Sequence, residues 1–223
     1  MSATKQCTMK IYFQGGKIKT GNKDVVIRAS PSNPPFTLPL LCGQLQNGGM
    51  KIFTTCHVHS SVLKGIPNKL EDFLPISNCD ARSKADLCIT LIWKEVGKDL
   101  EVVTSPTTNS IFKGEINLLR YFSKRFNLFP VQNTKIEVQI DSILDSIHAE
   151  VNWGTGNLSR VMSASLEPSL KKAPFFATQN LSLADIYAFV LISNEKAAKM
   201  TPAIQEWMKR CQIALMNKTS GNF

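Results

Sequence analysis

Residues 178–192 read Thr-Gln-Asn-Leu-Ser-Leu-Ala-Asp-Ile-Tyr-Ala-Phe-Val-Leu-Ile and carry the strongest structural signal in the chain. Ser182 and Asp185 have the spacing of a capping box, in which each side chain accepts a hydrogen bond from the backbone amide of the other residue. The helix that follows is apolar on nearly every side, which is typical of a buried helix, and the run is too short to span a membrane. We therefore predict a helix through the centre of a helical core, with Ser182 and Asp185 as structural caps rather than catalytic groups.

The composition is that of an ordinary globular protein. The chain has 223 residues, 43% of them hydrophobic, which suffices for one large domain or two small ones. The first residues lack the apolar core of a signal peptide. The six cysteines show no C-x-x-C spacing, so we expect reduced thiols of an intracellular protein, without disulfides or a zinc site.

The net charge of +9 is concentrated near the N-terminus. Residues 1–28 contain six basic residues and one acidic residue, while the rest of the chain is nearly balanced. We expect residues 1–23 to form a flexible basic leader. A solvated tail and an arm that touches RNA or an acidic partner are both open interpretations.

Residues 24–127 alternate between strand and helix patterns. A strand at 24–30, a helix at 36–45 and a strand at 50–58 are followed by a polar segment. Alternating apolar residues at 87–93, the turn Gly97-Lys98-Asp99 and residues 100–104 predict a hairpin, and 115–126 predicts an amphipathic helix. This order predicts a thioredoxin-like subdomain.

Residues 133–217 show only helical patterns. Thr134 and Glu137 form a second candidate capping box, and we expect further helices at 158–172, interrupted or ended near Pro168, and after Thr201. The chain therefore predicts an α/β plus all-α fold in which a thioredoxin-like half packs on an all-helical half, the arrangement of glutathione-transferase-like proteins.

Five stretches narrow the resemblance, at residues 24–35, 57–62, 90–94, 182–185 and 207–211. Together they resemble the aminoacyl-tRNA-synthetase-complex-interacting multifunctional protein 2 family, the glutathione-transferase-like scaffold of the animal multisynthetase complex. The resemblance runs from about Asp24 to Asn217. It implies a cytosolic protein that also enters the nucleus and binds glutamyl-prolyl-tRNA synthetase and aspartyl-tRNA synthetase. Longer family members carry an N-terminal lysyl-tRNA-synthetase-binding motif and coiled coil, but the leader has no leucine heptads, so we expect a short form or a fragment.

The resemblance also implies two partner-binding surfaces. The first comprises Ser61, Leu70, Asn117, Arg120, Tyr121 and Lys124, and the second comprises Trp153, Asn157, Glu206 and Arg210. Arg210 is the strongest candidate, because it borders the apolar stripe of the last helix and offers a bidentate donor to a partner carboxylate. An intrachain ion pair is the alternative.

Catalysis is not predicted. Ser30 or Ser32 lies where a transferase activates the glutathione thiol, so a glutathione-dependent enzyme is the first alternative function. The expected proline before Leu87 and the Glu/Gln-Ser pair in 104–113 are missing, so we assign no catalytic, cofactor-binding or metal residues.

His57 and His59 lack a third ligand nearby in sequence, and His148 is expected on a helix surface. A tRNA-binding auxiliary acting through the leader is the second alternative, although direct nucleic-acid binding is not the expectation.

Overall fold

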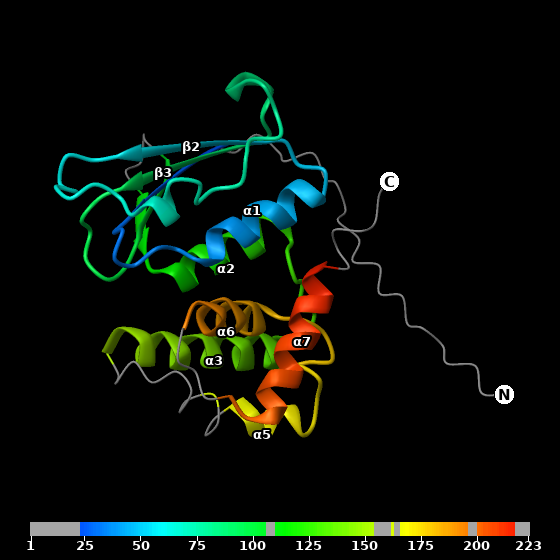
Figure 1. Ribbon diagram of the computed structural model, residues 1–223. Helices are drawn as coiled ribbons and strands as arrows, with labels where there is room; N and C mark the ends of the chain where they lie inside the picture. The colour runs from blue at the N-terminus through cyan, green and yellow to red at the C-terminus, as the bar shows by residue number, and fades with distance from the viewer. Residues whose placement is uncertain (1–22, 106–109, 154–161, 163–165, 196–199, 217–223) are drawn as a thin grey trace.

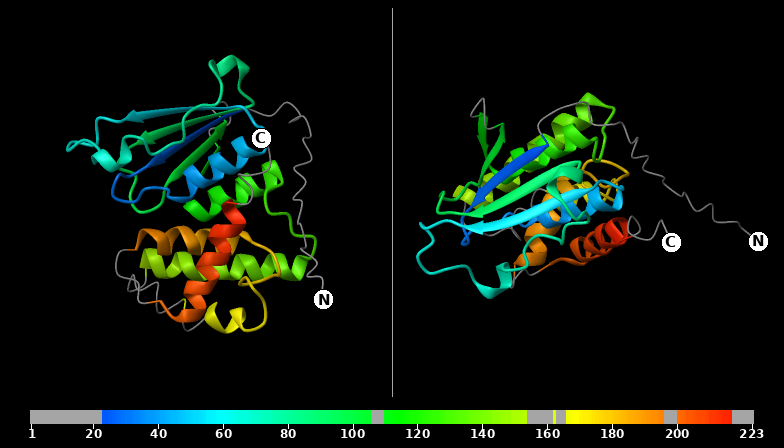
Figure 2. Two further views of the ribbon diagram at one scale, coloured as in Figure 1. Left: turned by 45° about the vertical axis from the view of Figure 1, so that its right-hand side comes forward. Right: turned by 90° about the horizontal axis from the view of Figure 1, so that it is seen from above.

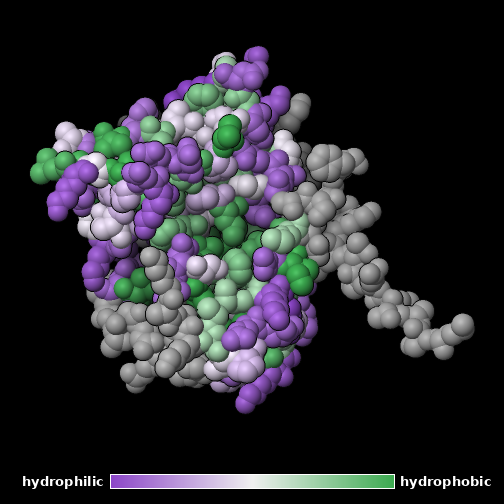
Figure 3. Space-filling view, viewed as in Figure 1, coloured by the Kyte–Doolittle hydropathy of each residue, from purple (hydrophilic) through white to green (hydrophobic). Residues whose placement is uncertain are grey.

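A computed structural model describes residues 23–105, 110–153, 162, 166–195 and 200–216. These residues form two packed halves, and among them the first half has the sheet and two α-helices and the second has four α-helices (Figure 1). The predicted leader, residues 1–23, lies outside this description apart from Lys23. In the described part of the chain a hydrophobic core runs through both halves, and Figure 3 shows hydrophobic residues (green) where the halves meet. α6 (Leu183–Asn194) contacts α1 (Thr37–Asn47) and α2 (Glu115–Phe126) of the first half.

The first half contains a five-stranded sheet in the order β2-β3-β1-β4-β5. The strands are β1 (Asp24–Ala29), β2 (Ile52–Val58), β3 (Leu87–Trp93), β4 (Glu101–Ser105) and β5 (Ser110–Lys113). β1 and β2 both pair with β3 in parallel, whereas β4 is antiparallel to β1 and to β5.

The predicted hairpin of 87–93 and 100–104 is wrong. β1 lies between β3 and β4, and the antiparallel pair next to each other in sequence is β4 and β5. β3 is buried at most of its positions because it occupies the interior of the sheet with a strand on either side. From Ile89 to Trp93 its residues alternate between buried and half-buried, as the sequence predicted, but this alternation identifies the covered face of a strand and not its neighbours in the sheet.

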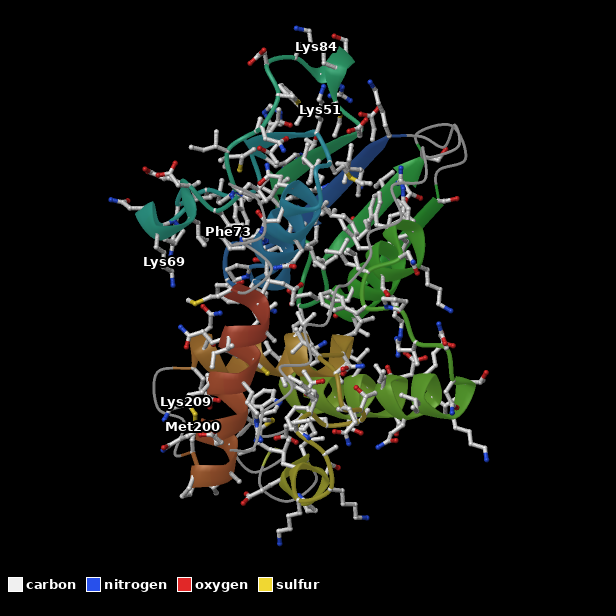
Figure 4. The ribbon with its side chains drawn as sticks, turned by 90° about the vertical axis from the view of Figure 1, so that its right-hand side faces the viewer. Lys51, Lys69, Phe73, Lys84, Met200 and Lys209 are labelled. Carbon is white, nitrogen blue, oxygen red and sulfur yellow. The ribbon has the colours of Figure 1, made fainter. Side chains whose placement is uncertain are left out.

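The segment between β2 and β3 is held to the body of the domain by aromatic packing. It contains the short turns η1 (Asn68–Leu70) and η2 (Arg82–Lys84). Phe73 packs between Phe36 and Trp93, with ring centroids 6.1 and 5.3 Å away. Figure 4 shows Phe73 beside α1, while Lys69 points away from the molecule.

The helices of the second half that the structure describes are α3 (Thr134–Trp153), α5 (Glu167–Leu170), α6 and α7 (Pro202–Met216). The predicted Thr134–Glu137 capping box is wrong, because the side-chain oxygen of Asn133 accepts from the Lys135 amide (2.9 Å). Of the helix predicted at 158–172, much lies outside the described residues. Of its described residues, 162 and 166–172, those from Glu167 to Leu170 form the single turn α5, where Pro168 lies in the first turn and does not end the helix. None of the described helices is both long and apolar enough to cross a membrane.

The capping box at the start of α6 is present, and Asp185 does more than cap. Its Oδ2 accepts from the amide and hydroxyl of Ser182. Its Oδ1 accepts from the Phe176 amide (3.0 Å) and from Nε1 of Trp207 (2.9 Å) on α7. Asp185 is fully buried, and this burial raises its pKa despite the four hydrogen bonds that favour the ionised form.

We predict that Asp185→Ala lowers the free energy of unfolding by about 3 kcal/mol or more. The variant loses a helix cap, which costs about 0.5–2 kcal/mol, and leaves buried donors unpaired at about 1–3 kcal/mol each. Urea denaturation measures the change. The matched control is Asp145→Ala, whose side chain is 66% exposed and whose loss should cost less than about 1 kcal/mol. Equal effects of the two substitutions would show that the contacts of Asp185 do not hold α6 in place.

Candidate functional site

The hydroxyl groups of Ser30 and Ser32, in the loop after β1, form hydrogen bonds within the chain. Ser30 is buried, and its Oγ lies 2.7 Å from Oγ of Ser32 and donates to Oε2 of Glu95 (3.1 Å). A transferase needs a free hydroxyl here to donate to a thiolate. In this chain a carboxylate already accepts from Ser30, and a thiolate at the same place would meet like charge.

The N-terminus of α1 is also satisfied from within the chain. Oε1 of Glu115, at the start of α2, accepts from the amide of Thr37 (2.8 Å) and from its hydroxyl (2.6 Å). A helix N-terminus attracts anions, and here the anion is a side chain. Burial raises the pKa of Glu115, while the two hydrogen bonds from Thr37 favour its ionised form.

A cavity of about 270 Å³ lies between the two halves. Loop residues 32–36 and 98–100 line it on one side, and side chains of α3 and α6 line it on the other. Polar contacts cross its edge: Nζ of Lys98 donates to the Asn152 carbonyl (2.6 Å), and Asn152 Nδ2 donates to Oδ1 of Asp99 (3.1 Å). His148 lies 3.5 Å from the same oxygen, so it belongs to this junction and not to the helix surface that the sequence predicted.

The predicted first surface is only partly assembled. Asn117, Arg120, Tyr121 and Lys124 all lie on α2. Ser61 follows β2 at the opposite edge of the sheet from β5, which α2 contacts, and its Oγ accepts from the Glu95 amide (3.2 Å).

Leu70 is 1% exposed, so we correct the prediction and remove it from the surface. The resemblance placed Leu70 there because it follows the second strand, but an apolar residue in such a segment can also anchor the segment to the core.

Ion pairs join α2 to α3 across this surface. Arg120 contacts Asp141 (2.7 Å) and Asp145 (3.0 Å), and Lys124 contacts Glu137 (3.0 Å). We call these five residues the α2–α3 surface. The three carboxylates were not among the predicted residues. They are spaced four residues apart on α3, as the two basic residues are on α2, and this matching spacing is a signal in the sequence that could have identified them.

The predicted second surface lies on α7 and the end of α3. The backbone of Trp153 ends α3, whereas its side chain and Asn157 lie outside the described residues. Glu206 is exposed and Arg210 is half-buried, with its Nε buried and without a hydrogen-bond partner in the described part of the chain. Within the described part of the chain, Arg210 forms no ion pair. We call Glu206 and Arg210 the α7 surface.

No cluster of three or more His, Cys, Asp or Glu side chains that could hold a metal ion is found among the described residues. His57 and His59 lie near Cys56 at the end of β2, and Nδ1 of His59 bonds Ser61. These residues lie at the end of a strand, where His59 is hydrogen-bonded within the loop that follows.

Comparison with known proteins defines the class first. A family model described as a thioredoxin-like domain matches residues 20–112. A theta class glutathione S-transferase from Xanthomonas axonopodis pv. citri, solved with glutathione bound, superposes with a TM-score of 0.50 at 10% identity, covering 91% of this chain and 99% of that one. The chain therefore has the predicted glutathione-transferase-like fold.

The relatives in sequence are more specific. Aminoacyl tRNA synthase complex-interacting multifunctional protein 2 of Cricetulus griseus and of Homo sapiens are each 31% identical over 201 residues, which is 88% of this chain and 61% of theirs. The chain is thus a homologue of these animal proteins, and the resemblance predicted from the sequence is confirmed. It spans about three fifths of the length of these relatives.

We predict that Glu115→Gln becomes progressively less destabilising, relative to the unsubstituted chain, as the pH rises. The folded pKa of Glu115 lies above its ordinary value of 4.5, so the folded state binds this proton more tightly than the unfolded state does. The stability contributed by protonation is present below about pH 4.5 and is lost as the pH rises through the folded pKa. Urea denaturation of both chains from about pH 4.5 to pH 8 measures the difference, and a gap that does not change with pH contradicts the prediction.

Proposed function

We propose that this chain is a non-catalytic scaffold domain of a multi-aminoacyl-tRNA-synthetase complex. The observation that carries the proposal is its homology to proteins named for interaction with that complex. The geometry supports a binding role, because the contacts that would hold and activate glutathione are made by Glu95 and Glu115 of the chain itself. The proposed location is the cytosol, with the nucleus as a second compartment.

Two surfaces are proposed to bind two partners. The α2–α3 surface is assigned to the glutathione-transferase-like domain of glutamyl-prolyl-tRNA synthetase and the α7 surface to aspartyl-tRNA synthetase. A longer N-terminus would add lysyl-tRNA synthetase. The α2–α3 and α7 surfaces belong to different helices, so one partner need not displace the other.

A glutathione-dependent enzyme is the competing function, because the fold is shared with transferases. We predict that the chain has no transferase activity and binds glutathione more weakly than about 1 mM, which corresponds to about −4 kcal/mol. Isothermal titration calorimetry with glutathione measures the affinity. Saturable binding tighter than this, lost in Ser30→Ala but retained in Ser193→Ala, an exposed serine on α6, would establish a working thiol site and overturn the non-catalytic proposal.

We predict that Arg210→Ala weakens binding to aspartyl-tRNA synthetase by about 2 kcal/mol, roughly thirtyfold, and leaves glutamyl-prolyl-tRNA synthetase binding unchanged. Arg210 is expected to supply paired donors to a partner carboxylate. Surface plasmon resonance with the purified synthetases measures both affinities. The matched control is Lys209→Ala, which removes the neighbouring exposed cation of α7 (Figure 4).

The pattern of losses decides between explanations. Equal loss of both partners in Arg210→Ala, together with a lower melting temperature, indicates damage to the fold. Unchanged binding of both partners would remove Arg210 from the α7 surface.

A further inference from the structure

One face of the sheet carries a side-chain pattern that the proposed function does not use. Strand register places Thr55, Thr90, Val26, Val103 and Ile111 side by side in one row across all five strands. The next row, toward the ends of β1, β2 and β3, contains His57, Ile92, Arg28, Glu101 and Lys113. We call the surface formed by these two rows the open face.

No described helix covers the open face. α1 and α2 pack on the other side of the sheet, and Figure 2 (right) looks down onto the strands without a helix in front of them. Sheets of parallel strands are nearly always covered on both faces, and β1, β2 and β3 are parallel. An uncovered parallel region is therefore a candidate for an external partner.

The first row is largely apolar. Oγ1 of Thr55 donates to Oγ1 of Thr90 (3.0 Å), so one hydrogen bond joins the two hydroxyl groups. Val26 and Val103 are half-buried, and Ile111 is 42% exposed. Four strand spacings make the row about 19 Å long, which equals about 13 residues of α-helix at 1.5 Å each.

Charges border the apolar row on both sides, and cations outnumber carboxylates. The cations are Lys23, Lys51, Arg82 and Lys84 at the strand starts and Arg28 and Lys113 at the other border; the carboxylates are Asp24, Asp80, Asp86 and Glu101. The η2 turn rises above the sheet at the strand starts (Figure 1), and Lys51 and Lys84 lie at this upper rim (Figure 4).

Most of the carboxylates at these borders are already engaged. Glu101 contacts both Arg28 (3.5 Å) and Lys113 (3.3 Å). Asp24 contacts Arg82 (2.7 Å), and Asp86 accepts from the Lys51 amide. The borders therefore retain an excess of positive charge that a partner can neutralise.

We propose that the open face is a third docking surface, and that its partner is an amphipathic α-helix of about four turns with acidic residues on both borders of its apolar stripe. A helix is 10–12 Å across with its side chains, so its apolar stripe covers the row while its borders reach the flanking cations. A second copy of this chain fits less well, because two such faces would bring their positive borders together. This surface is distinct from the α2–α3 and α7 surfaces.

Two synthetic peptides of about 18 residues test the proposal with the full chain. Both carry a leucine stripe at helical spacing; one has glutamate on the borders and the other has lysine. Fluorescence anisotropy is expected to show saturable binding of the glutamate peptide and at least about tenfold weaker binding of the lysine peptide. Backbone NMR shifts are expected at Val26, Thr90 and Val103.

Matched variants distinguish peptide binding at the open face from non-specific binding elsewhere on the protein. Ile111→Ser and Lys113→Glu are expected to weaken binding of the glutamate peptide at least about fivefold. The controls Ile213→Ser and Lys209→Glu, both exposed on α7, should leave it unchanged. Ile111 is already 42% exposed, so its loss should leave the melting temperature nearly constant.

Three results would overturn the proposal. They are the absence of saturable binding, equal losses in test and control variants, and NMR shifts that map to another surface. A concentration-dependent dimer that Lys113→Glu changes would assign the face to a second copy instead. None of these measurements involves a synthetase, so failure here leaves the proposed scaffold function untouched.

Discussion

The buried carboxylate of Asp185 is the interaction on which the helical half depends. It accepts hydrogen bonds from the start of α6, from the loop before it at Phe176 and from Trp207 on α7. A charged group is costly to bury unless donors surround it, so these three segments are fixed relative to one another. Arg210 lies one helical turn beyond Trp207, and the position of the proposed α7 surface is therefore set by a contact in the core.

A second buried carboxylate has the same role in the sheet half. Glu115 belongs to α2 and binds the first amide of α1, at the place where a helix start attracts an anion. This contact joins the two helices and places a side chain where an anionic ligand would bind. The hydroxyl of Ser30 is likewise engaged within the chain, because it donates to Glu95. Polar groups that could serve a ligand in this fold here stabilise the loop and the helices around it.

Features encoded by neighbouring residues could be predicted from the sequence, and features set by distant contacts could not. The Ser182–Asp185 box is local, and it was predicted correctly. The cap of α3 was misplaced by one residue, to Thr134 from Asn133, because both residue types are good caps. The pairing of β3 and β4 failed because β1, more than 55 residues earlier in the chain, inserts between them. Leu70 was placed on the surface by the family resemblance, and its burial in a long loop leaves no periodic signal in the sequence that could have corrected this placement.

The two buried carboxylates also explain how a glutathione-transferase-like fold can be suited to scaffolding. A scaffold needs surfaces whose positions do not change when a small ligand comes or goes. In this chain the side chain of Glu115 occupies the anion position at the start of α1, and Asp185 holds α7 in place. Both arrangements are therefore formed without a bound ligand. The α2–α3 surface, the α7 surface and the open face lie on different elements around this fixed interior. Because the three surfaces are separate, a partner proposed for one of them would leave the other two free.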